Sequence, residues 1–200
     1  RPRLAMRSYL EVALPPLSDR NAMFQLGRLH YLGEGGEPKN LVESEKWTTA
    51  AAALGHPVAQ FNAGRLHYHR RPVSDPVAAV KWYKLSAAQG YASAMHNLAL
   101  AMQDGEGCPA DPVGALALLK QACAQCEEHR FSLVAVAQAY ARGIGTEVDH
   151  TEAAGWLRRA AELECPRAQM LLSGKYRRGQ GLEQNAREAF ELMRRAAEDN

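Results

Sequence analysis

An internal repeat runs through this chain of 200 residues and narrows its possible folds to repeat architectures. The segment from Gly55 to Gly64 matches the segment from Gly90 to Ala99 at an offset of 35 residues. The same register gives a column of small residues with steps of 37, 35, 38 and 36 residues: Gly27, Gly64, Ala99, Ala137 and Ser173. A repeat of this length cannot bury its apolar face alone, so we predict that successive units stack on one another.

Each repeat carries the signals of a turn followed by a second helix. Paired glycines, which permit positive φ and end helices, mark four of the five turns: Gly33 and Gly35, Gly105 and Gly107, Gly143 and Gly145, Gly179 and Gly181. A short polar residue that suits a helix N-cap then follows in every repeat: Asn40, Asp75, Asp111, Asp149 and Asn185. Two of these caps precede a proline, and the other three have a glutamate three residues later, as in a capping box. We therefore predict a helix hairpin in each repeat.

The second helix of every hairpin has one apolar face. The fourth residue after the cap is small, and the seventh is large and apolar: Trp47, Trp82, Leu118, Trp156 and Leu192. A pair of small residues follows four positions further on, and these spacings place the whole set on one helical face. Small residues allow two helices to approach closely, while the large residue fills the space between hairpins.

The combined columns resemble one repeat family. The motif Ala22-x-Phe24-x-Leu26-Gly27 is followed by Gly33-x-Gly35, then by Trp47 and by Gly55-His56. This pattern is similar to that of the Sel-one-like repeat (SLR) family, a relative of the tetratricopeptide (TPR) repeats, over residues 22 to 200. The chain departs from the family pattern in its second turn, where Arg70-Arg71-Pro72 replaces glycines, and in a longer junction between Cys126 and Leu133. We expect the stacking to be least regular at those two places.

The resemblance implies an all-α fold, a right-handed α-α superhelix (solenoid) of about five hairpins preceded by a partial N-terminal unit. We expect residues 1–21 to form that partial unit and residues 22–200 to form one continuous solenoid domain. The predicted repeats are 22–57, 58–92, 93–128, 129–166 and 167–200. Because the last helix runs to Asn200 without a polar capping helix, we expect either a longer natural chain or a terminal repeat that docks, for example by self-association.

Composition and motifs exclude several classes of function. The formal net charge of +2 does not suit a nucleic-acid partner, and no apolar run approaches the roughly 20 residues that span a bilayer. The start of the chain lacks the apolar core of a signal peptide, and bacterial periplasm and cytoplasm both stay open as compartments. No nucleotide-binding loop, nucleophile elbow or zinc-helix motif is present. We predict that the chain is not an enzyme and uses no cofactor.

Function is therefore expected at a protein-binding surface. In the related TPR solenoids, the first helix of each hairpin lines a concave side that receives peptides or helices, and the resemblance implies the same role for this chain. The polar positions of those helices that lie outside the repeat columns are the candidate contacts: Gln25, Arg28, Asn62, Arg65, Asn97, Gln138 and Lys175. Repeated amide side chains can hydrogen-bond the backbone of an extended ligand. We predict a scaffold or adaptor with a protein or peptide partner.

Other side-chain clusters offer alternatives to this interpretation. Cys123, Cys126 and His129 have the spacing of zinc ligands and suggest a metal- or redox-responsive domain, but both cysteines occupy columns that require small residues. A disulfide between Cys126 and Cys165 would have to close the spacing of about 10 Å between packed helices. His67 and His69 stand two apart on a predicted helix, so at most one should face a given partner.

Arginine pairs recur toward the C-terminus at 158–159, 177–178 and 194–195. The repeat aligns them into a basic ridge that could meet an acidic partner or nucleic acid. Glutamates such as Glu191 and Glu198 are interspersed among them, however. We therefore favour a solvated face with local ion pairs.

Overall fold

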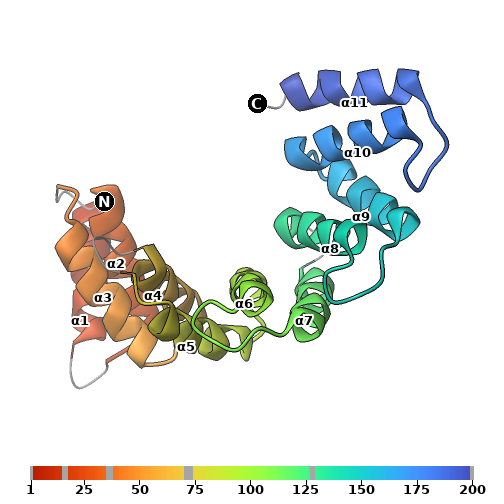
Figure 1. The fold of residues 1–200 in the computed structure, drawn as a ribbon. Helices are drawn as coiled ribbons and strands as arrows, with labels where there is room; N and C mark the ends of the chain where they lie inside the picture. Colours follow the sequence, from red (N-terminus) through yellow and green to blue (C-terminus); the bar gives the residue numbers. More distant parts are fainter. Residues whose placement is uncertain (1, 15–17, 35–37, 70–73, 127–128, 199–200) are drawn as a thin grey trace. The chain divides into compact units, whose positions relative to one another are not determined.

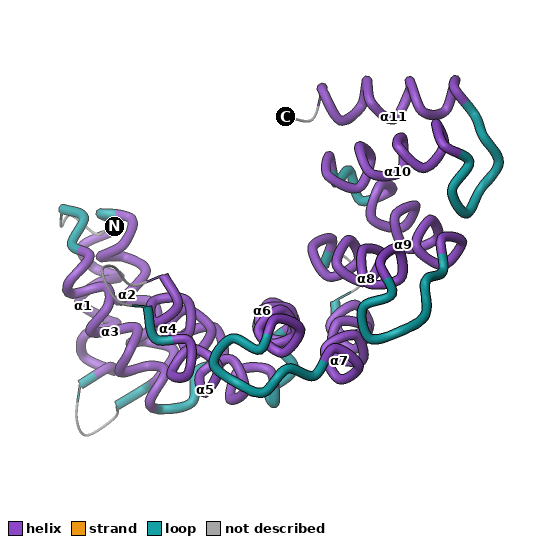
Figure 2. Tube along the Cα trace, in the orientation of Figure 1, coloured by secondary structure: helices purple, strands orange, loops and turns teal. Residues whose placement is uncertain are grey.

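The computed structural model describes residues 2–14, 18–34, 38–69, 74–126 and 129–198. Within these ranges the chain forms eleven α-helices and no strand, which confirms the predicted all-α class (Figure 1). Figure 2 marks these helices along the trace, with the described loops between them in a second colour. The Arg70–Pro72 turn and positions 127–128 of the long junction, where irregular stacking was predicted, lie outside the described residues.

The helices divide between two compact units, residues 1–94 and residues 95–200. The first unit contains α1 (Pro2–Ala13), α2 (Arg20–Leu32), α3 (Leu41–Ala53), α4 (Pro57–His69) and α5 (Pro76–Ala87). Helix α6 (Ala92–Asp104) begins at the end of the first unit and continues in the second. The second unit also contains α7 (Pro112–Gln125), α8 (Arg130–Arg142), α9 (His150–Glu162), α10 (Pro166–Arg178) and α11 (Ala186–Glu198).

Consecutive helices pack in pairs, as the repeat predicts. In the first unit α2 packs on α3 and α4 packs on α5, and in the second unit α8 packs on α9 and α10 on α11. Contacts between α3 and α4, and between α9 and α10, then join one hairpin to the next. Helix α1 packs on α2 in the place of a preceding unit.

All five predicted N-caps form. The side chains of Asn40, Asp149 and Asn185 each accept hydrogen bonds from two backbone N–H groups of the following helix, at 2.9 to 3.1 Å. Asp75 and Asp111, which precede a proline at the first helical position, each accept one such bond, at 2.9 and 2.8 Å. Each side chain thus satisfies donors that the first turn of a helix leaves unpaired.

The backbone of each cap residue also closes the hairpin. Its N–H donates to the carbonyl of the residue three positions after the small column, for example from Asn40 to His30 at 2.8 Å and from Asp149 to Tyr140 at 2.9 Å. The same bond joins Asp75 to His67, Asp111 to Met102 and Asn185 to Tyr176. Because a backbone carbonyl makes this contact, the side chain in that column is free to vary between histidine, methionine and tyrosine.

The small column lies where the two helices of a hairpin touch. A methyl group added at Gly27 would meet Thr48 Oγ1 at 2.7 Å, and one added at Gly64 would meet the ring of Tyr83 at 2.5 Å. Both distances are shorter than real side-chain contacts. Close approach of the helices therefore explains the column.

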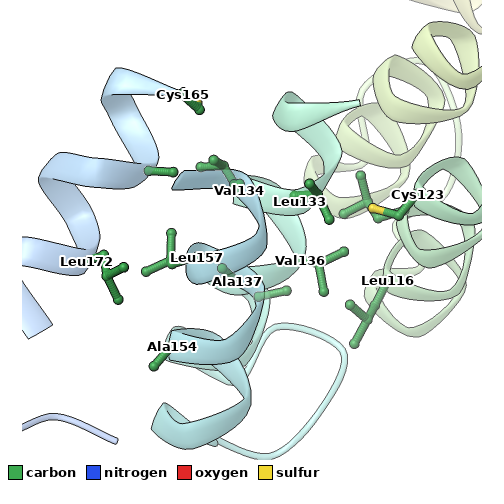
Figure 3. Close-up of a cluster of buried hydrophobic side chains, with 14 of the residues drawn as sticks. Leu116, Cys123, Leu133, Val134, Val136, Ala137, Ala154, Leu157, Cys165 and Leu172 are labelled. Carbon is green, nitrogen blue, oxygen red and sulfur yellow. The ribbon is translucent and has the colours of Figure 1, made fainter. Parts of the chain in front are cut away.

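The apolar faces form clusters of buried side chains between the helices. In the second unit one cluster takes residues from α6 to α11, and Figure 3 shows its members on α7 to α10, among them Leu116, Leu133, Leu157 and Leu172. In the first unit Trp47 packs against a cluster from α1 and α2, and Trp82 packs against one from α3 and α4. The large residues of the second helices thus pack between hairpins.

Candidate functional site

A groove of about 610 Å³ opens in the first unit where α2, α3 and α4 meet. Its lining comes from Phe24, Gly27, Arg28 and Tyr31 on α2, Leu41, Ser44, Glu45 and Thr48 on α3, and Asn62, Arg65, Leu66, His67 and His69 on α4. This volume lies within the range of pockets that hold small ligands or a few residues of a peptide.

Three of the seven predicted contact residues line this groove. Arg28 comes from α2, and Asn62 and Arg65 come from α4. Gln25 lies one turn before Arg28 and accepts a hydrogen bond from its guanidinium at 3.1 Å. Asn62 is half-buried, and its amide makes no hydrogen bond to the described residues. The groove therefore presents polar groups that are available to a ligand.

The other three predicted contacts belong to the second unit. Asn97 on α6 and Gln138 on α8 are half-buried. Lys175 on α10 is only 6% exposed, so most of its side chain is closed to a partner. Burial, together with the nearby charge of Arg178, lowers the pKa of Lys175 below its usual value.

The groove lies beside a position of α3 where the first hairpin has a small residue and the following repeats have large ones. The eighth residue after the cap is Tyr83, Leu119 or Leu157 in the next three repeats, and each of these side chains is buried. In the first repeat that position is Thr48, which lies against Gly27 just as Tyr83 lies against Gly64. A threonine is much smaller than a tyrosine or leucine, so space stays open above it.

Two further polar residues of α3 accompany Thr48. The fourth residue after the cap is Ser44 where the other repeats have alanine, and the fifth is Glu45 where they have an apolar residue. Sequence reasoning missed this part of the groove because it followed only the first helices of the hairpins. A comparison of these columns across the repeats would have found it, because only the first repeat is polar at the fifth and eighth positions.

Two residues that line the groove, Phe24 and Arg65, contact aromatic rings outside it. The ring of Phe24 stacks on His56, with their centroids 4.3 Å apart. Burial, followed by the charge of Arg20, lowers the pKa of His56, so this ring is neutral at pH 7. The guanidinium of Arg65 lies 5.8 Å from the centre of the Phe61 ring, within range of a cation–π interaction.

The histidine pair on α4 behaves differently from the prediction. His67 and His69 both line the groove, although residues two apart point in different directions in the middle of a helix. They occupy the last turn of α4, which ends at His69. The groove thus extends to the C-terminal end of α4, where both histidines contribute to its lining.

The proposed zinc ligands do not come together as a site. Cys123 is buried, Cys126 is exposed and His129 is half-buried, and no three His, Cys, Asp or Glu residues in the described ranges could hold a metal ion. Burial raises the pKa of Cys123 to about 11, so its thiol is protonated at pH 7. All four cysteines are free, including Cys126 and Cys165. The geometry thus offers no support for a metal- or disulfide-based function.

Several arginines of the predicted ridge have local partners. Arg194 pairs with Glu191 at 2.9 Å and with Glu198 at 3.2 Å. Arg158 donates to the hydroxyl of Tyr176 at 3.2 Å. These contacts fit a solvated face with local pairs rather than a surface poised for an anionic ligand.

The comparison with known families tests the repeat assignment directly. The model of the Sel1 repeat matches residues 20–56, 57–91, 92–125, 131–165 and 166–200. The chain belongs to the Sel1 repeat family. The predicted resemblance to Sel-one-like repeats is thereby confirmed. The groove lies in the first Sel1 repeat, which contains α2 and α3, together with helix α4 of the second.

Solved structures show the same Sel1 repeat fold. A protective antigen of uropathogenic Escherichia coli that displays an SLR fold matches 99% of this chain with 28% identity and a TM-score of 0.86. The chain spans only 42% of that protein's length. A Sel1 repeat protein from Oxalobacter formigenes has a TM-score of 0.87 and 24% identity over 98% of this chain and 77% of its own. Among curated proteins, no sequence matches the chain.

Sel1 repeat proteins generally act as scaffolds for protein–protein interactions, and they are generally not enzymes. In the part of this chain that the structure describes, no helix has the length and apolar character needed to cross a membrane.

Proposed function

We propose that this Sel1 repeat protein is an adaptor without catalytic activity that binds a segment of a protein partner in the groove between α2, α3 and α4. The observation that carries the proposal is the groove itself. It combines predicted contact residues with three polar residues of α3, Ser44, Glu45 and Thr48, at positions where the other repeats have no such set. Binding through one side of a helical repeat array suits a scaffold, because neighbouring repeats hold the contact helices in fixed positions.

The lining suits an extended peptide. The amide of Asn62 can donate to and accept from a peptide backbone, and the guanidinium groups of Arg28 and Arg65 donate hydrogen bonds. Apolar side chains border these groups: Tyr31 is 55% exposed, Leu41 57% and Leu66 41%. Covering them on binding would supply a hydrophobic contribution of roughly 25 cal/mol for each Å² of apolar surface that leaves water.

Contacts beyond the groove form a second part of the proposal. Asn97 and Gln138 occupy first helices of later hairpins, and both remain candidate contacts within the second unit. Lys175 contributes little to such a path because its side chain is buried.

The experiment is to capture partners from an extract of the source organism with the parent and with two groove variants. Thr48→Tyr reproduces in the first repeat the bulky residue of the second, and Asn62→Ala with Arg65→Ala removes two polar contacts. We expect a partner that the parent binds to be lost by both variants. Circular dichroism and thermal melts verify that each variant is folded.

The variant Asn21→Ala is the matched control, because it removes the same side-chain amide from an exposed position of α2 that does not line the groove. Asn97→Ala tests the second part of the proposal, and a partner that this variant loses also contacts the second unit. A partner that all variants retain binds another surface, and that result would show the groove assignment to be wrong.

A further inference from the structure

Basic side chains dominate the charged groups around the groove. Arg28 and Arg65 line it, and Glu45 is the acidic residue among its described lining. The ammonium group of Lys39 lies 4.8 Å from the ring centre of Tyr31, another lining residue, so a third positive charge stands close to the rim. The local balance of charge therefore favours an anionic ligand.

The two arginines have no carboxylate partner in the described part of the chain. Arg28 uses one N–H to donate to the neutral amide of Gln25, and Arg65 lies near the Phe61 ring. By contrast, Arg194 on α11 is paired with two glutamates. Because neither groove arginine forms an ion pair with the described residues, no carboxylate among them compensates either charge, and N–H donors remain for a ligand.

The whole first unit adds to this local field. Residues 1–94 contain 12 Lys and Arg against 7 Asp and Glu, a net charge of +5, whereas residues 95–200 contain 12 against 15, a net charge of −3. The overall charge of +2 hides this difference. A positive unit attracts acidic ligands over distances of about 10 Å at moderate salt concentration.

Charge alone does not describe the ligand, because much of the lining is apolar. Phe24, Tyr31, Leu41 and Leu66 contribute side chains to the groove, and the last three are exposed. An inorganic anion or a bare phosphate would leave these side chains in water. A peptide with an apolar residue beside its acidic one would cover them.

We propose that the groove selects acidic peptide segments in which Asp or Glu stands next to a large apolar residue. This specificity rests on the proposed function. Arg28 and Arg65 donate to the ligand carboxylate, and Tyr31, Leu41 and Leu66 cover the apolar side chain. Glu45 repels the carboxylate from its own part of the groove, so it directs the acidic residue toward the arginines.

The experiment selects peptides from a displayed random library on the full chain and, in parallel, on Thr48→Tyr. Peptides that bind the parent but not Thr48→Tyr define the groove ligands. We expect these to be enriched in Asp and Glu adjacent to Leu, Phe, Tyr or Trp. Thr48→Leu serves as a second filling variant should Thr48→Tyr fail to fold.

The affinity of one selected peptide, made synthetically, then tests the charges one at a time. Arg65→Ala and Arg28→Ala should each weaken it by about 5- to 10-fold, and the effect should shrink at high salt. Glu45→Gln should strengthen it by about 2- to 5-fold, since a repulsive charge is removed. Replacing Lys46, which is exposed on α3 and paired with Glu43, should leave the affinity unchanged.

The outcomes separate the two proposals. Groove ligands without acidic enrichment, or an Arg65→Ala variant with unchanged affinity, would contradict the acidic specificity while the groove remains the binding site. If no selected peptide is sensitive to Thr48→Tyr or Thr48→Leu, both proposals fail. A single-stranded oligonucleotide that displaces the peptide at equal concentration would identify the ligand as a polyanion, and the specificity for acidic peptides would then be wrong.

Discussion

The close contact between Gly64 and Tyr83 shows why each repeat keeps a small residue at this position of its first helix. Helix α4 lies so close to α5 that the buried Tyr83 ring occupies the place of a side chain at position 64. In the first repeat the same relation holds between Gly27 and the smaller Thr48, and the groove results from the difference in size. One residue pair thus sets both the packing of a hairpin and the presence of a binding surface.

Gly64→Ala should destabilise the protein by about 1 to 3 kcal/mol, because a methyl group at this position overlaps a ring that has no room to move. Gly155→Ala is the control, since nothing lies within 4 Å of its added methyl group and alanine favours the helix. The free energy of unfolding of Gly155→Ala should be higher than that of the parent by about 0.5 to 1 kcal/mol. Urea denaturation followed by circular dichroism measures both. If Gly64→Ala leaves the free energy of unfolding unchanged, the two helices can move apart without an energetic cost.

A histidine in the second unit should make stability depend on pH. Burial, followed by the charges of His129 and Arg167, lowers the pKa of His96 to about 4. The folded protein therefore binds fewer protons than the unfolded one, whose histidine has a pKa near 6.5. This contribution to stability is complete above about pH 6.5 and is lost as the pH falls toward 4.

His96→Gln should therefore lose less stability than the parent on acidification. Between pH 7 and pH 4.5 the difference should be on the order of 2 kcal/mol, measured by urea denaturation at each pH. His69→Gln, at an exposed position, should follow the parent. Equal acid sensitivity of His96→Gln and the parent would mean that His96 does not contribute.

At the scale of the helix, the N-caps show how local sequence defines each element. The same boundary is built in two ways, by a cap that accepts two N–H groups or by a cap followed by proline. In the second type the proline has no N–H group, so the cap side chain has one fewer backbone donor to accept from.

Asp149→Ala should lower the stability of the protein by about 1 kcal/mol, because two N–H groups at the start of α9 lose their acceptor. Asp149→Asn keeps an acceptor oxygen and should restore most of this stability. Thermal melts of the three proteins make the comparison. If Asn and Ala are equally destabilising, the hydrogen bonds of the cap are not the source of the effect.

Over the whole molecule, the buried apolar residues are distributed unevenly. The second unit has one cluster that spans α6 to α11, whereas the described clusters of the first unit each join two helices. The first unit also holds the groove and has a net positive charge, whereas the net charge of the second unit is negative. The described part of the first unit also has fewer buried apolar residues, and together with its excess charge this favours local opening.

Hydrogen–deuterium exchange should therefore be slower in the second unit. Backbone amides of α8 and α9 should exchange at least about tenfold more slowly than those of α1 and α2. Mass spectrometry of peptides from both units provides the measurement. Equal protection would show that the two units open together, in spite of their different cores.

The repeat, the all-α class and the five caps could be predicted from the sequence, because each depends on neighbours within a few residues along the chain. Arg28, Asn62 and Arg65 were also predicted, from their place on the first helices. The groove itself was not, since it arises where three helices meet and depends on the small size of Thr48 opposite Gly27. The burial of Lys175 likewise depends on packing and could not be predicted from its neighbours along the chain. Local hydrogen bonds define where each helix begins, but only packing between helices determines which polar residues remain available to a partner.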